Sequence, residues 1–270
     1  SLSHSICSPT RKLVIIGASG HGKVIADIAL MCGYADILFL DDNPAVSQCA
    51  GFPVVGTSSM AGKLGGRCDY VVAIGNPMAR ERIQESIDGK LVTLVHPNAT
   101  IGRCVEIGEG TVVMAGAVVN SDTVIGKGVI VNTCASVDHD CRIANYVHVS
   151  VGAHVAGTVD IHERTWLGIG SCVTNNVSIC SDCMVGAGAV VVRDIDVSGT
   201  YVGIPARFSH VNENWPSAGL TSRQKPTLQN DGLFGGCKNN HKTRGIPSLQ
   251  TTHYLFFYSE NNDVEMQLNS

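Results

Sequence analysis

Aliphatic residues recur at every sixth position in the second half of the chain. Stepping by six from Ile101 to Val191, each position holds Ile, Val or Leu, and two residues earlier, from Ala99 to Ala189, each side chain is small or β-branched. A period of six fits neither an α-helix nor an alternating strand. It suits a chain that turns a corner every six residues, so that three short strands form one coil of about 18 residues and successive coils stack.

Glycine often follows the aliphatic position of the hexad, as at Gly108 and Gly126. We expect these glycines to allow a positive φ in the turns. With 30 glycines and few aromatic residues, the composition agrees with many tight turns around a core of small and aliphatic side chains.

The first third of the chain has a different pattern, in which short apolar runs alternate with amphipathic stretches. We expect strands over residues 13–16, 37–40 and 70–74, and helices over 23–31 and 78–87. Such alternation predicts a small parallel, Rossmann-like α/β unit. The expected organisation is therefore an α/β domain over 12–94, a β-helix over 95–208 and a tail over 209–270, whose mixed polar composition predicts an irregular or disordered segment.

A glycine-rich turn, Gly-Ala-Ser-Gly-His-Gly at residues 17–22, separates the first strand from the first helix. Such a turn can offer backbone N–H groups to a phosphate. Asp41 and Asp42 follow about 20 residues later, where an acidic residue can reach a ribose hydroxyl. The spacing is G-x-x-G-x-G and not the G-x-G-x-x-G of dinucleotide sites. Three interpretations stay open: an NAD site, a purely structural turn, and a site for a nucleotide-linked ligand.

Charge and hydropathy exclude several functional classes. The net charge of the 270 residues is −4 and no basic stripe is present, so a nucleic-acid-binding role is not expected. No apolar run is long enough to span a bilayer, and residues 1–12 lack the apolar core of a signal peptide. The odd number of cysteines, 11, argues against a disulfide framework and predicts a reducing, cytoplasmic location.

Motifs in both halves of the chain occur in a distinctive order. They are residues 17–22, 39–42, 73–76, 131–133, 137–141, 147–153 and 202–206. Over residues 12–208 this order resembles the sialic acid O-acetyltransferase/PglD-like family of hexapeptide-repeat acetyltransferases. Within that family the chain looks most like N-acetyltransferases of UDP-linked 4-amino sugars. The resemblance implies a left-handed parallel β-helix, a homotrimer, acetyl-CoA as co-substrate and a nucleotide sugar as acceptor.

The resemblance also implies roles for individual residues. His139 would be the general base, and Asp140, which stands where relatives often carry Glu, would polarise it if the shorter side chain reaches. Gly157 would direct its backbone N–H at the thioester oxygen. Contacts with acetyl-CoA are implied for Gly157, Ile169, Gly188 and Arg207. Contacts with the nucleotide sugar are implied for Gly17, Ser19, His21, Asp41, Asp42, Gly75, Asn76, Asn132 and His148.

Other interpretations of the chain stay open. The reaction could be O-acetylation of sialic acid or N-acetylation of a GDP-linked amino sugar, and a non-catalytic, nucleotide-sugar-binding scaffold is a distinct class. His139 lies two places after the inward Val137, so an exposed turn histidine is the simplest alternative for it. Stacked positions differ by 18, and no two of His139, His148, His154 and His162 have that spacing, so no metal site is expected within one chain.

Overall fold

A four-stranded parallel sheet forms the first part of the chain. The computed structural model describes residues 11–64 and 68–212. The sheet has the order β2-β1-β5-β6, and every neighbouring pair is parallel. Its strands are β1 (Lys12–Ile16), β2 (Ile37–Leu40), β5 (Cys68–Val72) and β6 (Lys90–Leu91). The small parallel sheet expected from the alternating pattern is confirmed.

Two helices follow the strands of this sheet. Helix α1 (Gly20–Met31) comes after β1 and helix α2 (Pro77–Glu85) after β5. Helix α2 begins with favourable end chemistry: the Asn76 side chain accepts a bond from the Ala79 N–H at 3.0 Å, and Pro77 occupies the first turn. The remaining elements of this part are β3 (Gln48–Cys49), β4 (Phe52–Pro53) and the short 3₁₀ helix η1 (Ser58–Met60).

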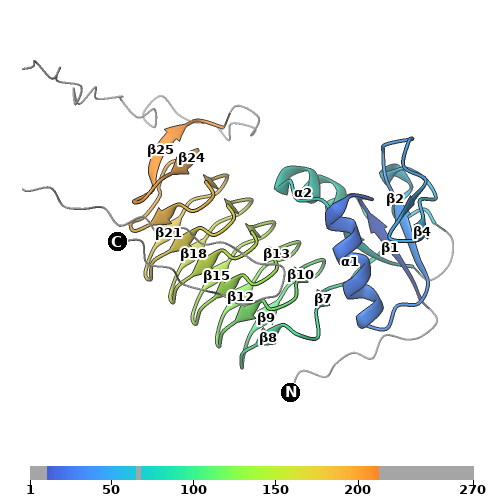
Figure 1. Cartoon of the computed structure of the whole chain (residues 1–270), viewed down its shortest axis with the longest axis horizontal. Helices are drawn as coiled ribbons and strands as arrows, with labels where there is room; N and C mark the ends of the chain where they lie inside the picture. Colours follow the sequence, from blue (N-terminus) through green and yellow to red (C-terminus); the bar gives the residue numbers. More distant parts are fainter. Residues whose placement is uncertain (1–10, 65–67, 213–270) are drawn as a thin grey trace, which may run out of the picture. The chain divides into compact units, whose positions relative to one another are not determined.

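The second part of the chain is a parallel β-solenoid whose short strands stack into three sheets (Figure 1). The first coil sheet contains β7 (Leu94–Val95), β10 (Val112–Val113), β13 (Ile130–Val131), β16 (His148–Val149), β19 (Trp166–Leu167), β22 (Met184–Val185), β24 (Thr200–Val202) and the antiparallel β25 (Arg207–His210). The second coil sheet contains β8 (Thr100–Ile101), β11 (Val118–Val119), β14 (Ser136–Val137), β17 (His154–Val155), β20 (Cys172–Val173) and β23 (Val190–Val191). The third contains β9 (Glu106–Ile107), β12 (Val124–Ile125), β15 (Arg142–Ile143), β18 (Asp160–Ile161) and β21 (Ser178–Ile179).

The hexad positions form the interior of the solenoid, as the sequence predicts. Val113 pairs with Val131, Val131 with Val149, and Val149 with Leu167, always 18 residues apart. Each aliphatic hexad residue from 113 to 191 is buried, and so is each small residue from 111 to 189. One continuous apolar cluster fills the coils. Each coil is therefore stabilised mainly by its two neighbours.

The expected reason for the hexad glycines is wrong. Gly108 has no positive φ; instead, a Cβ on it would lie 2.6 Å from the Gly126 carbonyl carbon, in the next coil. Close stacking of the coil backbones therefore requires glycine there. The positive φ falls two residues later, at Gly110 (69°), and the same turn position is taken by a non-glycine residue at Asp140 (58°).

The α/β part and the first coils share an apolar core. Leu13 and Ile15 of β1 belong to one buried cluster with Val112, Met114 and Ile130 of the coils. Helix α1 contributes Ile25, Ile28 and Ala29 to the same cluster and contacts both β1 and β7, so it packs between the sheet and the first coil sheet (Figure 1). The next outward residues of that sheet, His148 and Trp166, follow Ile130 in the stack of coils and lie beyond this core.

The end of the solenoid differs slightly from the expected boundary. Strand β25 pairs with β24 and continues to His210, two residues into the segment expected to be an irregular tail. The rest of that segment, residues 213–270, lies outside the described residues. Among the helices of residues 11–64 and 68–212, none has the length and apolar character needed to cross a membrane.

Candidate active site

His139 and Asp140 occupy the turn between β14 of the second coil sheet and β15 of the third. The His139 side chain is 57% exposed, and its Nδ1 lies 2.7 Å from Asp140 Oδ2. The shorter aspartate therefore reaches the histidine. Asp140 has φ of 58°, and this left-handed backbone conformation carries the carboxylate in the turn beside the ring. When Nδ1–H donates to the carboxylate, Nε2 is left as the acceptor that can take a proton.

The charges around His139 favour its protonated form. The hydrogen bond to Asp140 raises the pKa of His139, and the neighbouring Asp138 carboxylate raises it further. Asp138 is itself held by Asn120 Nδ2, at 2.8 Å, and by the backbone N–H of His139. These two bonds lower the pKa of Asp138, so it stays ionised at neutral pH. The turn thus combines an accessible imidazole with two carboxylates that increase its basicity.

Gly157 lies directly beneath the His139 ring. The two residues are 18 apart and so occupy the same turn position in successive coils. A Cβ on Gly157 would lie 2.6 Å from both Cε1 and Nε2 of His139, so only glycine leaves room for the ring. The Gly157 N–H donates to no acceptor within the described part of the chain. A basic ring nitrogen and an available backbone donor therefore lie side by side.

A second group of predicted residues gathers on the outer face of the first coil sheet. His148 is 6% exposed, and its Nε2 lies 3.2 Å from Asn132 Nδ2. Its ring stacks on Trp166 with 4.8 Å between centroids, and the indole N–H donates to Ser150 Oγ at 2.7 Å. Gly75 follows β5, and a Cβ added to it would lie 3.8 Å from His148 Cε1. These contacts place the loop before α2 over the coil.

The histidines of this group are kept neutral. Burial, with smaller contributions from the Arg80 guanidinium and His21, lowers the pKa of His148 to about 3. Burial also lowers the pKa of His21 to about 4, with Arg80 as the smaller cause. His148 Nδ1 and His21 Nε2 are both buried without a hydrogen-bond partner of good geometry in the described residues. Buried polar atoms normally have a hydrogen-bond partner, so a bound water or a polar ligand group could complete the bonding of these two nitrogens.

Arg80 is a residue of this region that the sequence motifs did not single out. It is 1% exposed and makes no ion pair among the described residues. Its guanidinium donates to the carbonyls of Gly128 (2.6 Å), Ile74 (2.8 Å), Gly75 (2.8 Å) and Tyr146 (2.6 Å). Burial lowers the pKa of Arg80 to about 9, so it is protonated at neutral pH. Arg80 thus ties the loop before α2 to two successive coils.

The glycine-rich turn is supported by the acidic residues at the end of β2. Asp41 Oδ2 accepts a bond from the Ala18 N–H at 2.6 Å, and its Oδ1 accepts from the Asn43 N–H. Asp42 accepts bonds from the backbone and side chain of Ser58, both at 2.8 Å. Gly17 has φ of 112°, and a Cβ there would meet the Ala73 carbonyl oxygen at 2.6 Å. Both carboxylates therefore have structural partners in the protein.

The other predicted residues of the turns are more dispersed. Ser19 precedes α1 but makes no capping bond through its side chain, and Asn76 caps α2. Ile169 is 62% exposed, and its carbonyl accepts the Gly188 N–H at 2.8 Å, so these two form one edge of the solenoid. Arg207 lies in β25, where its side chain bonds to the carbonyl of Ala206. Of the four residues expected to contact acetyl-CoA, only Ile169 and Gly188 are hydrogen-bonded to each other in the described part of the chain.

One chain does not bring the two histidines together. His139 lies in the turn between the second and third coil sheets, whereas His148 lies in a strand of the first. The His139 site and the His148 cluster are therefore on different sides of the coil. No group of three or more metal-ligating side chains occurs within residues 11–64 and 68–212.

A solenoid of stacked hexads with an exposed histidine over a glycine defines the class of hexapeptide-repeat acyltransferases. The PglD N-terminal domain model matches residues 12–87. The acetyltransferase domain of PglB from Neisseria gonorrhoeae is 43% identical, covers 74% of this chain and 100% of its own, and superposes with a TM-score of 0.71. PerB from Caulobacter crescentus, solved with CoA and GDP-perosamine, is 38% identical, with coverage of 74% and 97% and a TM-score of 0.70.

The chain belongs to the PglD-like family of hexapeptide-repeat acetyltransferases, and its solenoid is a left-handed parallel β-helix. Both the family and the fold expected from the motifs are confirmed. A curated relative, UDP-N-acetylbacillosamine N-acetyltransferase of Bacillus subtilis (strain 168), is 34% identical over 114 residues, or 39% of this chain. The match spans about half of that relative, 52% of its length.

Proposed function

We propose that this chain transfers the acetyl group of acetyl-CoA to the amino group of a nucleotide-linked sugar, with His139 as the general base. The observation that carries the proposal is the turn in which Asp140 orients His139 above Gly157. The relatives add support from their own ligands, since the Neisseria domain was also solved with acetyl coenzyme A. The B. subtilis relative favours a UDP-linked acceptor, whereas PerB, which was solved with GDP-perosamine, supports a GDP-linked acceptor as the alternative.

The chemistry follows from the polarity of the turn. The sugar amine attacks the thioester carbonyl carbon and transfers a proton to Nε2 of His139. The carbonyl oxygen becomes an oxyanion, which the Gly157 N–H stabilises in a preorganised position. The tetrahedral intermediate collapses and the C–S bond breaks, and the sulfur leaves as a thiolate that takes the proton back from His139. No covalent intermediate on the enzyme is needed.

The acceptor is proposed to bind where the α/β part faces the first coil sheet. The buried ring nitrogens of His21 and His148 offer polar contacts, and Trp166 offers a fixed aromatic surface. Loop 17–22 begins at the carboxyl end of β1, where ligands bind in open α/β sheets. Because His139 is on another side of the coil, we propose that a neighbouring copy, in a homotrimer, brings its His139 to this acceptor site.

Asp140→Asn tests the electrostatic part of the proposal. Asparagine can still accept the Nδ1–H bond but lacks the charge, so the pKa of His139 should fall. The base then becomes neutral at lower pH, and the acidic limb of the kcat/KM profile should move to lower pH. The maximal rate should drop by up to about tenfold because the base is weaker. A profile with an unmoved acidic limb would show that His139 does not set it.

The deciding experiment is CoA thiol release from acetyl-CoA with a panel of UDP- and GDP-linked amino sugars and free sialic acid. Rapid release with one UDP-linked amino sugar is the expected result and identifies the acceptor. Release with a GDP-linked sugar would reassign the nucleotide. Release with sialic acid alone would replace N-acetylation by O-acetylation. No release with any member of the panel would contradict the proposed reaction and favour a binding scaffold.

A further inference from the structure

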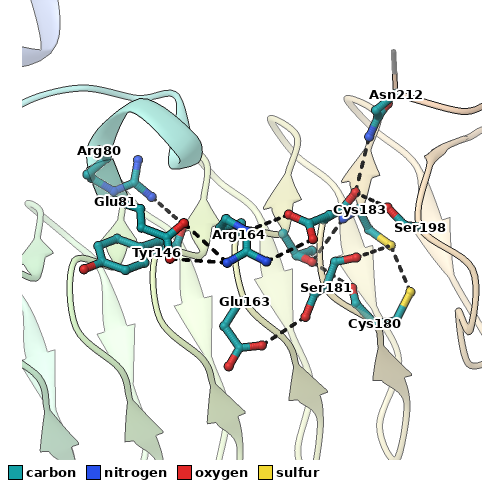
Figure 2. Close-up of polar contacts among 12 residues, drawn as sticks. Arg80, Glu81, Tyr146, Glu163, Arg164, Cys180, Ser181, Cys183, Ser198 and Asn212 are labelled. Atoms are coloured by element: carbon teal, nitrogen blue, oxygen red, sulfur yellow. Dashed lines mark hydrogen bonds and ion pairs between the residues drawn. The ribbon is translucent and has the colours of Figure 1, made fainter. Parts of the chain in front are cut away.

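Two cysteines lie in contact in a turn near the end of the solenoid. Cys180 and Cys183 are separated by two residues, the only such spacing among the 11 cysteines of the chain. Their Sγ atoms are 3.4 Å apart (Figure 2). Cys180 follows β21 and is half-buried, whereas Cys183 precedes β22 and is fully buried in the coil interior. Two thiols at this distance need only a small movement to reach the S–S bond length of about 2.05 Å.

We propose that Cys180 and Cys183 are a reversible oxidation site, a dithiol that closes to an intrachain disulfide and thereby loosens the attachment of α2 to the solenoid. A peroxide is the only oxidant that formation of this disulfide requires. The Cys180 thiol gives its proton to solvent, the thiolate attacks a peroxide oxygen, and the O–O bond breaks to form a sulfenic acid. The hydroxide or alkoxide that leaves takes up a proton from solvent and becomes water or alcohol. The Cys183 sulfur then attacks Cys180, the S–O bond breaks, and a second molecule, water, leaves with the proton of the Cys183 thiol.

The surroundings of the two thiols assign different roles to them. The bond from the Cys183 thiol lowers the pKa of Cys180, and the same contact, together with burial, raises the pKa of Cys183. Cys180 is also the more accessible of the two. The thiolate is the nucleophile in thiol chemistry, so Cys180 is the residue that meets the oxidant and Cys183 the one that resolves the sulfenic acid.

The residues between the cysteines connect the turn to α2. Asp182 is 7% exposed and holds Arg164 in a two-point ion pair, with Nε–Oδ1 of 2.7 Å and Nη2–Oδ2 of 3.0 Å. Arg164 Nη1 in turn lies 3.3 Å from both carboxylate oxygens of Glu81, in α2. Figure 2 shows Arg164 between Glu81 of α2 and the turn that holds Cys180 and Cys183. The backbone carbonyl of Asp182 also accepts a bond from Ser198 Oγ.

Closure should disturb this row of charges. The Cys183 side chain is enclosed by the close-packed coil interior, so most of the movement must come from Cys180 and the two residues between them. Asp182 has φ of 62°, a conformation with little freedom to adjust. Moving its carboxylate weakens the two-point pair and leaves Arg164 less able to hold Glu81. Since Asn76 and Gly75 precede α2, a looser helix lowers affinity for the acceptor, and this last consequence rests on the proposed function.

The test uses the full chain, treated with hydrogen peroxide and compared with the fully reduced protein. Peptide mass analysis without reductant should show Cys180 joined to Cys183 with the loss of two hydrogens, reversed by dithiothreitol. Hydrogen exchange across residues 77–85 should become faster on closure. Where acetyl transfer is measurable, the KM for the sugar should rise several-fold while that for acetyl-CoA stays unchanged.

Cys180→Ser should abolish both the cross-link and the change in exchange, and Cys183→Ala is a second variant in case the first folds poorly. Cys104→Ser is the matched control, because Cys104 is exposed and lies in the first coils. Failure of the cross-link to form in the folded wild type would overturn the proposal. A cross-link that leaves exchange in 77–85 unchanged would overturn the connection to α2. Neither readout requires turnover, so a chain inactive on every sugar would contradict the proposed function alone.

Discussion

Replacing His139 with alanine is expected to lower kcat by about 10²–10⁴-fold, the usual contribution of a general base. The side chain is exposed, and among residues 11–64 and 68–212 it bonds only to Asp140 of its own turn, so its removal should leave the fold intact. Acetyl-CoA binding, measured by calorimetry, should be nearly unchanged, because the backbone donor of Gly157 remains.

His162→Ala is the matched control for this substitution. His162 is also an exposed histidine of the solenoid, directly after β18, but among the described residues no carboxylate bond orients its ring and no glycine lies against it. Its replacement should leave kcat within a factor of about two. If His139→Ala retained comparable turnover, the base would have to be sought elsewhere, and the role of Asp140 would lose its basis.

The second large effect is expected on stability, from Arg80→Met. Methionine fills much of the same volume but donates no hydrogen bond, so the carbonyls of Gly128, Tyr146 and Ile74 would be left buried and unsatisfied. We expect the free energy of unfolding to fall by about 2–5 kcal/mol, measured by urea denaturation. The KM for the acceptor should also rise, because the loop that carries Gly75 loses its attachment to the coils.

Arg82→Met provides the comparison for Arg80→Met on the same helix. Arg82 is exposed, so its replacement should change stability by no more than about 0.5 kcal/mol. Equal destabilisation by the two substitutions would indicate a general effect of charge on α2. It would contradict a specific role for the guanidinium of Arg80 in joining the loop to the coils.

The period of six made much of the solenoid predictable, including contacts that depend on the stacking distance. His139 and Gly157 are 18 residues apart and so are His148 and Trp166, and both pairs are in contact. Trp166 was nevertheless missed as a site residue, although its spacing from His148 was a usable signal. The contact of Arg164 with Asp182 follows the same rule.

Contacts between the α/β part and the coils could not be read from the sequence. Arg80 binds carbonyls 48 and 66 residues away, and no local pattern encodes which backbone oxygens a long side chain meets. The approach of Gly75 to His148 likewise depends on how the two parts pack. Whether Asp140 reaches His139 depended on a left-handed turn conformation, which most non-glycine residues avoid.

The position of His139 over Gly157 has a consequence for how the stack of coils can change in length. The two residues come from adjacent coils at the same turn. A whole coil inserted between them would part the base from its backbone donor by one layer, about 4.8 Å. A coil added after Val191 would leave the pair untouched, since each layer contacts only its neighbours. Coils can therefore be gained or lost after Val191 during evolution while the two coils that hold His139 and Gly157 stay unchanged.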